Sequence, residues 1–205
     1  MSLPAMERLV EQMLADQQPD LKAYFAAHEA RLEHLIWCPT TAVTDNAPMR
    51  FIIEYWERLQ AEAGGAMPPA SAVSPFDLKP VLGHVVLIDV LDDGWDGQFR
   101  VYGTKVAETY GRDMTGRRVS EIDGGNYVST FFRCLYRAAW LRQLPYYTHH
   151  YPPPHVAVES WQRVALPLAG ADGKVSRFLA CNIAGPWRPP QKRPGARSDA
   201  PVTTS

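Results

Sequence analysis

The sequence of 205 residues lacks an excess of charge of either sign, and it lacks long apolar runs. Lys and Arg together number 21 and Asp and Glu number 22, so the chain has little of the cationic surplus that drives non-specific binding to nucleic acids. The most apolar stretch, from Val81 to Leu91, is too short for a membrane-spanning helix, which needs roughly 20 apolar residues. We therefore expect neither a nucleic-acid partner nor a membrane partner.

Cysteine is scarce as well. Cys38, Cys134 and Cys181 are far apart and odd in number, so they form neither a disulfide framework nor the paired spacing of a zinc site. The first residues also lack the basic start and the apolar run of a signal peptide. These features predict a reduced, cytoplasmic protein with buried thiols.

What the sequence does contain begins with helical patterns. Residues 5–36 carry two such patterns, separated near Pro19, and the second one places apolar residues at helical spacing: Leu21, Phe25, Leu32, Leu35 and Ile36. A further helix is predicted after Pro48, with Ile52 and Trp56 on one face. Residues 1–45 are therefore interpreted as an N-terminal helical extension.

From residue 81 onwards the hydrophobic period becomes that of β-strands. Five strands are predicted, at Val85–Leu91, Gln98–Tyr102, Tyr146–Tyr151, Val158–Leu168 and Lys174–Ala184, with helices at Thr104–Tyr110 and Tyr127–Leu141. In the second strand, alternation puts Phe99 and Val101 on one face and Arg100 and Tyr102 on the other. Because no helix separates the last three strands, we expect an α+β domain at 46–185, with a five-stranded antiparallel sheet and helices on one face.

The last segment has a different composition. Residues 186–205 contain five prolines and one aromatic residue, Trp187, and cannot bury enough apolar surface to offset the entropy of ordering. We predict a disordered, proline-rich tail there.

Several motifs in the middle of the chain resemble those of the PAS-like sensor family, which occurs mainly in short bacterial proteins. They are Glu54-Tyr55-Trp56, Ser74-Pro75, the run from Phe99 to Thr104, the run from Tyr110 to Gly116, Leu166-Pro167-Leu168 and Asp172-Gly173. The resemblance implies a five-stranded antiparallel sheet whose helix-covered face can hold a small ligand. It also implies a domain that senses, dimerises or docks partners.

A ligand pocket of that kind would be lined by aromatic and apolar residues of the sheet and the facing helix. The candidates are Arg100, Tyr102, Tyr110, Phe131, Phe132, Leu135, Tyr147, Trp161 and Phe178. The aromatic rings can equally be plain core. Arg100 can bind a carboxylate or phosphate ligand with its planar fork, or it can form a salt bridge across the sheet with Asp89 or Glu159.

The sequence shows no sign of a metal or cofactor site. His149, His150 and His155 form the only histidine cluster, and neighbours on a strand point to opposite faces, so His149 and His150 cannot chelate one metal ion. The predicted helix at Tyr127–Leu141 carries no histidine for haem, and no flavin-attachment motif is found. We predict no cofactor and no metal.

The expected function is regulatory. A PAS-like domain of this kind would bind a small apolar or amphipathic ligand, or a signalling protein, and pass on a conformational change. Apolar helix faces that a single sheet would leave exposed predict a homodimer through Leu21, Phe25, Leu32, Ile52 and Trp56. Two alternatives stay open: an interaction module with a vestigial pocket, and a small isomerase-like enzyme acting on a hydrophobic substrate with Asp89 as its base. The first interpretation implies that the protein is not an enzyme.

Overall fold

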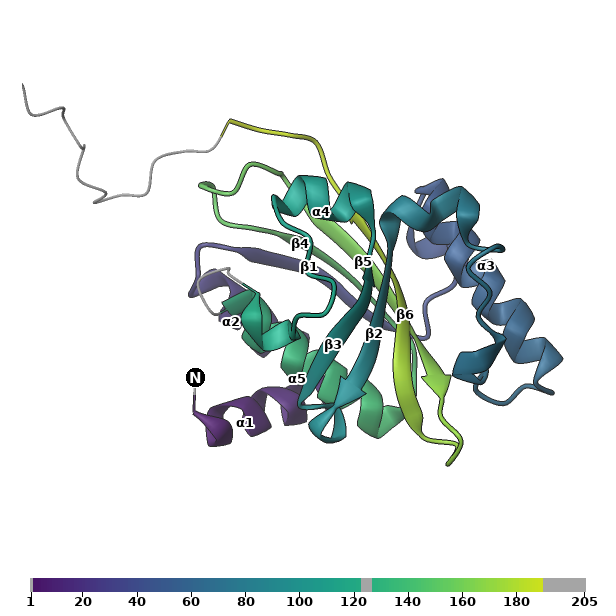
Figure 1. The fold of residues 1–205 in the computed structure, drawn as a ribbon. Helices are drawn as coiled ribbons and strands as arrows, with labels where there is room; N and C mark the ends of the chain where they lie inside the picture. Colours follow the sequence, from purple (N-terminus) through teal and green to yellow (C-terminus); the bar gives the residue numbers. More distant parts are fainter. Residues whose placement is uncertain (1, 123–126, 190–205) are drawn as a thin grey trace, which may run out of the picture.

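A six-stranded antiparallel sheet forms the centre of the molecule (Figure 1). The structure is a computed structural model that describes residues 2–122 and 127–189. The strand order is β1-β4-β5-β6-β2-β3. The strands are β1 (Arg31–Trp37), β2 (Val85–Leu91), β3 (Asp96–Tyr102), β4 (Tyr146–Tyr151), β5 (Trp161–Ala169) and β6 (Val175–Ala184). The predicted α+β class with an antiparallel sheet is confirmed, and the sheet has one strand more than expected.

The helices cover both faces of this sheet. They are α1 (Leu3–Leu14), α2 (Gln18–Ala26), α3 (Ala47–Glu62), α4 (Thr104–Tyr110) and α5 (Tyr127–Arg142). Figure 1 shows α3 on one side of the sheet and α5, with α1 and α2, on the other. The expectation of helices on one face was wrong. In β5, residues 164–168 are all buried without alternation, and a strand that is buried on both sides needs a cover on both sides.

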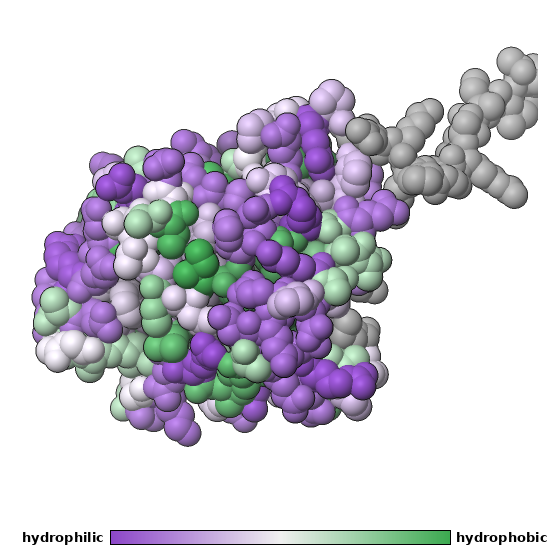
Figure 2. Space-filling view, turned by 180° about the vertical axis from the view of Figure 1, so that it is seen from behind, coloured by the Kyte–Doolittle hydropathy of each residue, from purple (hydrophilic) through white to green (hydrophobic). Residues whose placement is uncertain are grey.

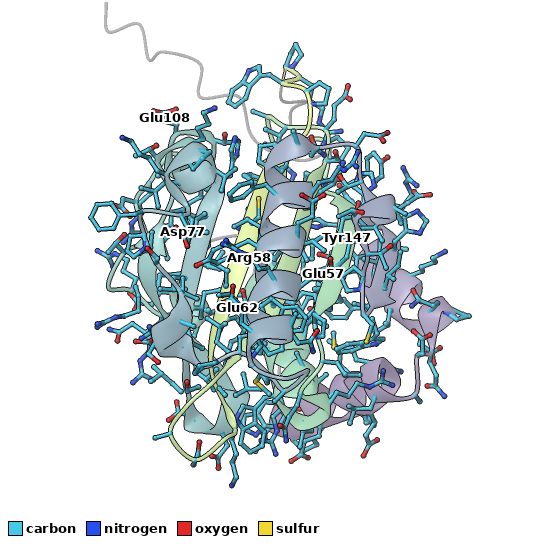
Figure 3. The ribbon with its side chains drawn as sticks, turned by 90° about the vertical axis from the view of Figure 1, so that its right-hand side faces the viewer. Glu57, Arg58, Glu62, Asp77, Glu108 and Tyr147 are labelled. Carbon is cyan, nitrogen blue, oxygen red and sulfur yellow. The ribbon has the colours of Figure 1, made fainter. Side chains whose placement is uncertain are left out.

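The face under α3 is closely packed. Met49, Ile52, Ile53 and Trp56 of α3 are buried against β5 and β6. The indole Nε1–H of Trp56 also donates a hydrogen bond to the Pro167 carbonyl over 2.8 Å. Figure 3 looks onto this helix, with Tyr147 of β4 on the same side of the sheet. This face forms a closed core of its own.

The other face is covered by α5, which packs in turn against α1. Phe131 and Leu135 of α5 have no exposed surface, and they lie in one core with Phe178 of β6 and with Leu21 and Phe25 of α2. The N-terminal helices therefore complete the main core of the domain.

The extra strand, β1, lies where the sequence pattern predicted a helix. It pairs with β4, with Leu32 opposite His150 and His34 opposite His149, so Glu33 is an additional residue that forms a bulge. A bulge shifts the alternation by one position. Leu32 and Leu35, three residues apart, are therefore both buried on one side, and their spacing imitates a helix.

The five residues predicted to form a dimer interface are buried inside the chain. Leu21, Phe25, Leu32, Ile52 and Trp56 are each no more than 6% exposed. The large hydrophobic residues that are exposed come from separate segments: Leu3, Phe76, Leu82, Leu141 and Trp187. On the face shown in Figure 2, hydrophobic residues likewise lie in several separate groups among hydrophilic ones. The exposed helix faces on which the dimer prediction rested are absent from the described residues.

Short 3-10 helices connect the main elements, at Thr41–Val43, Ala70–Ala72, Lys79–His84, Asp92–Gly94 and Val119–Glu121. The proline-rich segment before β2 is attached to the sheet where the Ala169 amide donates to the Pro68 carbonyl. None of the described helices is long and apolar enough to span a membrane.

The beginning of the predicted disordered tail is held by hydrogen bonds. Trp187 forms an isolated bridge with Val158. The Arg188 guanidinium donates to the carbonyls of Pro152, Pro153 and Val156. Residues 190–205 of that predicted tail lie outside the described residues.

Candidate ligand pocket

A cavity of about 630 Å³ opens on the α5 side of the sheet. Its walls come from α4, from the first turns of α5, from the turn between α2 and β1, and from β3 to β6. This volume lies in the range that small-molecule sites occupy in proteins, about 300–1,000 Å³. We refer to it below as the cavity.

Four of the predicted pocket residues line the cavity: Tyr102, Tyr110, Phe132 and Trp161. Phe131, Leu135 and Phe178 lie on the same side of the sheet, but they are fully buried in the core and not among the lining residues. For these three residues, the alternative interpretation as core residues is the one that the structure shows.

Tyr102 reaches the cavity because of a second bulge. Ile88 pairs with Phe99 and Leu87 with Val101, so Arg100 is the additional residue in β3. The bulge brings Tyr102 to the same side as Phe99, where the two rings meet edge to face at 5.1 Å. The expected alternation, with Tyr102 opposite Phe99, was therefore wrong for this pair.

Two predicted pocket residues, Tyr147 and Arg100, are not among the residues that line the cavity. Tyr147 packs on the α3 face, where its hydroxyl donates to Gln162 Oε1 over 3.1 Å (Figure 3). The Arg100 side chain is 58% exposed, and its Nε lies 3.2 Å from Asp89 Oδ2. The alternative interpretation of Arg100, a salt bridge with Asp89, is the one that the structure shows.

One end of the cavity is polar, and its residues come from the three neighbouring strands β4, β5 and β6. None of these residues was among the pocket candidates predicted from the sequence. Arg163 of β5 pairs in register with Asn182 of β6, and its Nε–H donates to Asn182 Oδ1 over 2.8 Å. The guanidinium carbon of Arg163 lies 3.6 Å from the centre of the Phe132 ring, a cation–π contact that holds the plane of the fork. His150 of β4 completes this group.

His150 is a neutral, buried imidazole. It is 3% exposed, and its Nδ1 has no hydrogen-bond partner. Burial, together with the nearby charge of Arg163 and with His149, lowers the pKa of His150 from 6.5 to about 3. At neutral pH the ring can donate one hydrogen bond and accept another.

His149 lies on the opposite face of the sheet from His150, as the alternation of the strand predicts. Its ring is 4.9 Å from that of Tyr151 and 6.5 Å from that of His34. His155 lines the cavity instead. Within residues 2–122 and 127–189, no group of three or more His, Cys, Asp or Glu side chains is arranged to hold a metal ion.

Gly103 allows α4, which forms one wall of the cavity, to start close to the backbone of residues 83–85. Gly103 precedes α4, and its amide donates to the Val85 carbonyl over 2.8 Å. A Cβ atom at this position would lie 2.3 Å from the Gly83 carbonyl oxygen, so only glycine fits this close approach of two backbone segments. Val106 and Tyr110 of α4 are thereby brought to the cavity.

Two further walls come from the segment after β4, at Pro152, Pro153 and Val156, and from the N-terminal segment. Ala27, His28 and Glu29, in the turn between α2 and β1, line the cavity. The His28 ring stacks on Tyr127 with ring centres 5.3 Å apart, and the Tyr24 hydroxyl donates to the Tyr127 carbonyl over 3.0 Å. The start of α5 and the N-terminal extension are thus joined at the rim.

One sequence signal pointed to Arg163. It stands two residues after Trp161 in the same strand, and residues two apart on a strand share a face. The prediction of Trp161 as a lining residue therefore extends to Arg163. His150 and Asn182 carry no comparable signal, because their positions depend on the pairing of β4 and β6 with β5.

Comparison with known proteins identifies the fold. A family model described as a PAS domain matches residues 44–182, which is more than half of the chain. No curated protein and no solved structure matches the chain. The matched residues contain five of the six strands and most of the cavity walls, whereas α1, α2 and β1 precede them. PAS domains are in general sensory and regulatory domains. The chain belongs to the PAS domain family.

Proposed function

We propose that this protein is a regulatory sensor that binds a small, largely apolar molecule in the cavity beside α5. The observation that carries the proposal is the cavity itself. Tyr102, Val106, Phe132 and Trp161 provide apolar walls, and Arg163 and its neighbours provide one polar end. A few convergent polar groups in a mostly apolar pocket are typical of a small-molecule site.

The position of the cavity supports a regulatory role. Its walls belong both to the matched PAS region and to the turn that follows α2. A ligand seated there contacts the N-terminal segment and the start of α5 together, so binding favours whichever arrangement of the two the ligand fits best. The signal would leave the domain through the N-terminal helices.

The enzyme alternative loses its candidate base. Asp89 forms ion pairs with Arg177 and Arg100 and is not among the residues that line the cavity. The Asp89 carboxylate is therefore paired with two guanidinium groups and is not placed to take a proton from a ligand in the cavity. The sensor is therefore the function that the site supports best.

Native mass spectrometry of the purified protein, followed by organic extraction, tests the proposal. We expect a co-purified small molecule, or binding of one from a panel of small amphipathic compounds. Val128→Trp, which fills the cavity from α5, should abolish binding. Val43→Trp adds the same bulk outside the cavity, in the Thr41–Val43 turn, and should leave binding intact.

If the protein binds none of these molecules, or if the two tryptophan variants behave alike, the sensor proposal is wrong. A partner that is captured by wild type and by Val128→Trp equally well would then favour the interaction module with a vestigial pocket.

A further inference from the structure

We infer that the ligand of the cavity is a monoanion, a small carboxylic acid with an apolar body, and that its carboxylate lies beside Arg163. The inference rests on the proposed function and adds the chemical class of the ligand. It follows from a cation at the cavity wall that has no anionic partner among residues 2–122 and 127–189.

Arg163 is half-buried, and it keeps most of its hydrogen-bonding capacity free. Its Nε–H is used by Asn182 Oδ1, a neutral acceptor. In the part of the chain that the structure describes, no Asp or Glu forms an ion pair with Arg163. The two terminal nitrogens of the fork donate to none of the described side chains or carbonyls. Cations that lose solvent in proteins are normally paired, and among the described residues Arg163 has no such pair, so we infer that a ligand supplies the anion.

The surroundings of Arg163 fix both its direction and the charge it favours. The guanidinium carbon lies over the Phe132 ring, 3.6 Å from its centre, and the Nε–H is bonded to Asn182 Oδ1. A planar fork held in this way matches the two oxygens of a carboxylate. His150, which is neutral, adds a buried Nδ1 with no partner at the same end of the cavity.

The rest of the cavity suits an apolar body. Tyr102, Val106, Ile122 and Trp161 line it. Arg163 is the one cation among the described lining residues, and the one carboxylate among them, Glu29, is exposed to solvent and forms no described ion pair with Arg163. A single negative charge on the ligand balances Arg163, whereas a doubly charged phosphate monoester would leave one charge unpaired in this apolar space. A medium-length fatty acid or an arylalkanoic acid has this shape and charge.

Isothermal titration with octanoate and with its neutral amide, octanamide, tests the inference. We expect octanoate to bind wild type at least tenfold more tightly, a difference of about 1.4 kcal/mol. Arg163→Gln should remove this preference while octanamide still binds. Arg100→Gln deletes the same charge at an arginine that is paired with Asp89 outside the cavity, and it should keep the preference.

A second variant tests the inference even if the Arg163→Gln protein does not fold. Asn182→Asp places a carboxylate at the position that already accepts from Arg163, so an internal ion pair should replace the ligand's charge and abolish the preference for octanoate. Equal binding of both probes to wild type overturns the anion inference and leaves the sensor proposal standing. If neither probe binds and the Val128→Trp test also fails, both are overturned. A preference that survives both Arg163→Gln and Asn182→Asp shows that Arg163 is not the anchor.

Discussion

The two faces of the sheet are built from alternate residues of the same strands, yet they differ in how completely they are packed. On one face, α3 lies along β5 and β6, and its apolar residues fill the space against Val164, Leu166 and Leu168. On the other, α5 packs closely over Phe178 and Ala180, and beyond its first turns the sheet faces the cavity. Within β5, the Val164 side chain packs in the core under α3, and its neighbour Arg163 lines the cavity.

Both faces of the sheet also carry buried polar side chains. Under α3, Gln162 Oε1 accepts hydrogen bonds from the side chains of Thr44, Asn46 and Tyr147. On the α5 side, the buried Thr148 Oγ1 and His150 Nδ1 have no partner. Unpaired buried polar atoms cost stability, and natural proteins keep few of them. His149 Nε2, on the opposite face from His150, is buried without a partner as well. What distinguishes His150 is that it lines the cavity, where the ligand that we propose can supply the missing partner.

The largest expected contrast comes from the same truncation on each face. Ile52→Ala leaves a void in the closed core and should lower the free energy of unfolding by about 3 kcal/mol. Ile122→Ala removes the same atoms from a half-buried position on the cavity wall, where the space joins an existing opening, and should cost about 1 kcal/mol. Urea unfolding of both variants measures the two values. Equal losses would mean that the two faces are packed alike.

Acid should lower the free energy of unfolding through His150, on the α5 side of the sheet. The pKa of His150 is about 3 in the folded state and 6.5 as its ordinary value, so between these pH values the unfolded chain binds a proton that the folded chain does not. Stability therefore falls as the pH drops below about 6.5, and His150 alone should account for about 2 kcal/mol by pH 5.

His150→Gln isolates this contribution. Chemical unfolding from pH 8 to pH 5 should show a shallower loss of stability in this variant than in wild type. His28→Gln, at an exposed histidine on the rim, should follow the wild-type curve. Parallel curves for all three proteins would contradict a neutral, buried His150.

A smaller contrast is expected from the two tryptophans that face opposite sides. Trp56→Phe leaves the Pro167 carbonyl without its donor and a gap beside it, so it should cost about 1.5 kcal/mol. Trp161→Phe, at the half-buried cavity wall, should cost less than about 0.5 kcal/mol and should change ligand affinity instead. Thermal unfolding with and without octanoate separates the two effects. A larger stability loss at Trp161 than at Trp56 would reverse the comparison.

Hydrophobic period correctly predicted helices and strands in which the period is not interrupted and a glycine or a proline marks the end. The helix from Thr104 to Tyr110 and the strand from Tyr146 to Tyr151 were predicted with the bounds that the structure shows, because a glycine or a proline follows each of them. Bulges at Glu33 and Arg100 interrupt the alternation of side chains, so predictions from hydrophobic period were wrong at both places. Each inserts one residue, so the first made a strand look helical and the second assigned Tyr102 to the wrong face.

The candidate site was only partly predictable for a related reason. The rings of Tyr102, Tyr110, Phe132 and Trp161 were identified by residue type and position, since aromatic residues on a sheet and its facing helix either fill a core or line a pocket. The sequence does not say which of the two each ring does. Phe131 and Phe132 are neighbours on one helix, and a rotation of about 100° per residue sends one into the core and the other to the cavity.

The sequence by itself determined the class of the domain, its antiparallel sheet and most of its elements, because hydrophobic period, glycine and proline act over a few residues. Only the tertiary structure decided that β1 joins the sheet, that α3 closes the second face, and that Arg163, His150 and Asn182 meet at the end of the cavity. These three residues are brought together by strand register, which links positions 13 to 32 residues apart in the chain. The sequence carries almost no net charge, and a count of charges cannot reveal that Arg163 is half-buried and has no anionic partner among the described residues. Only the fold shows where this cation lies.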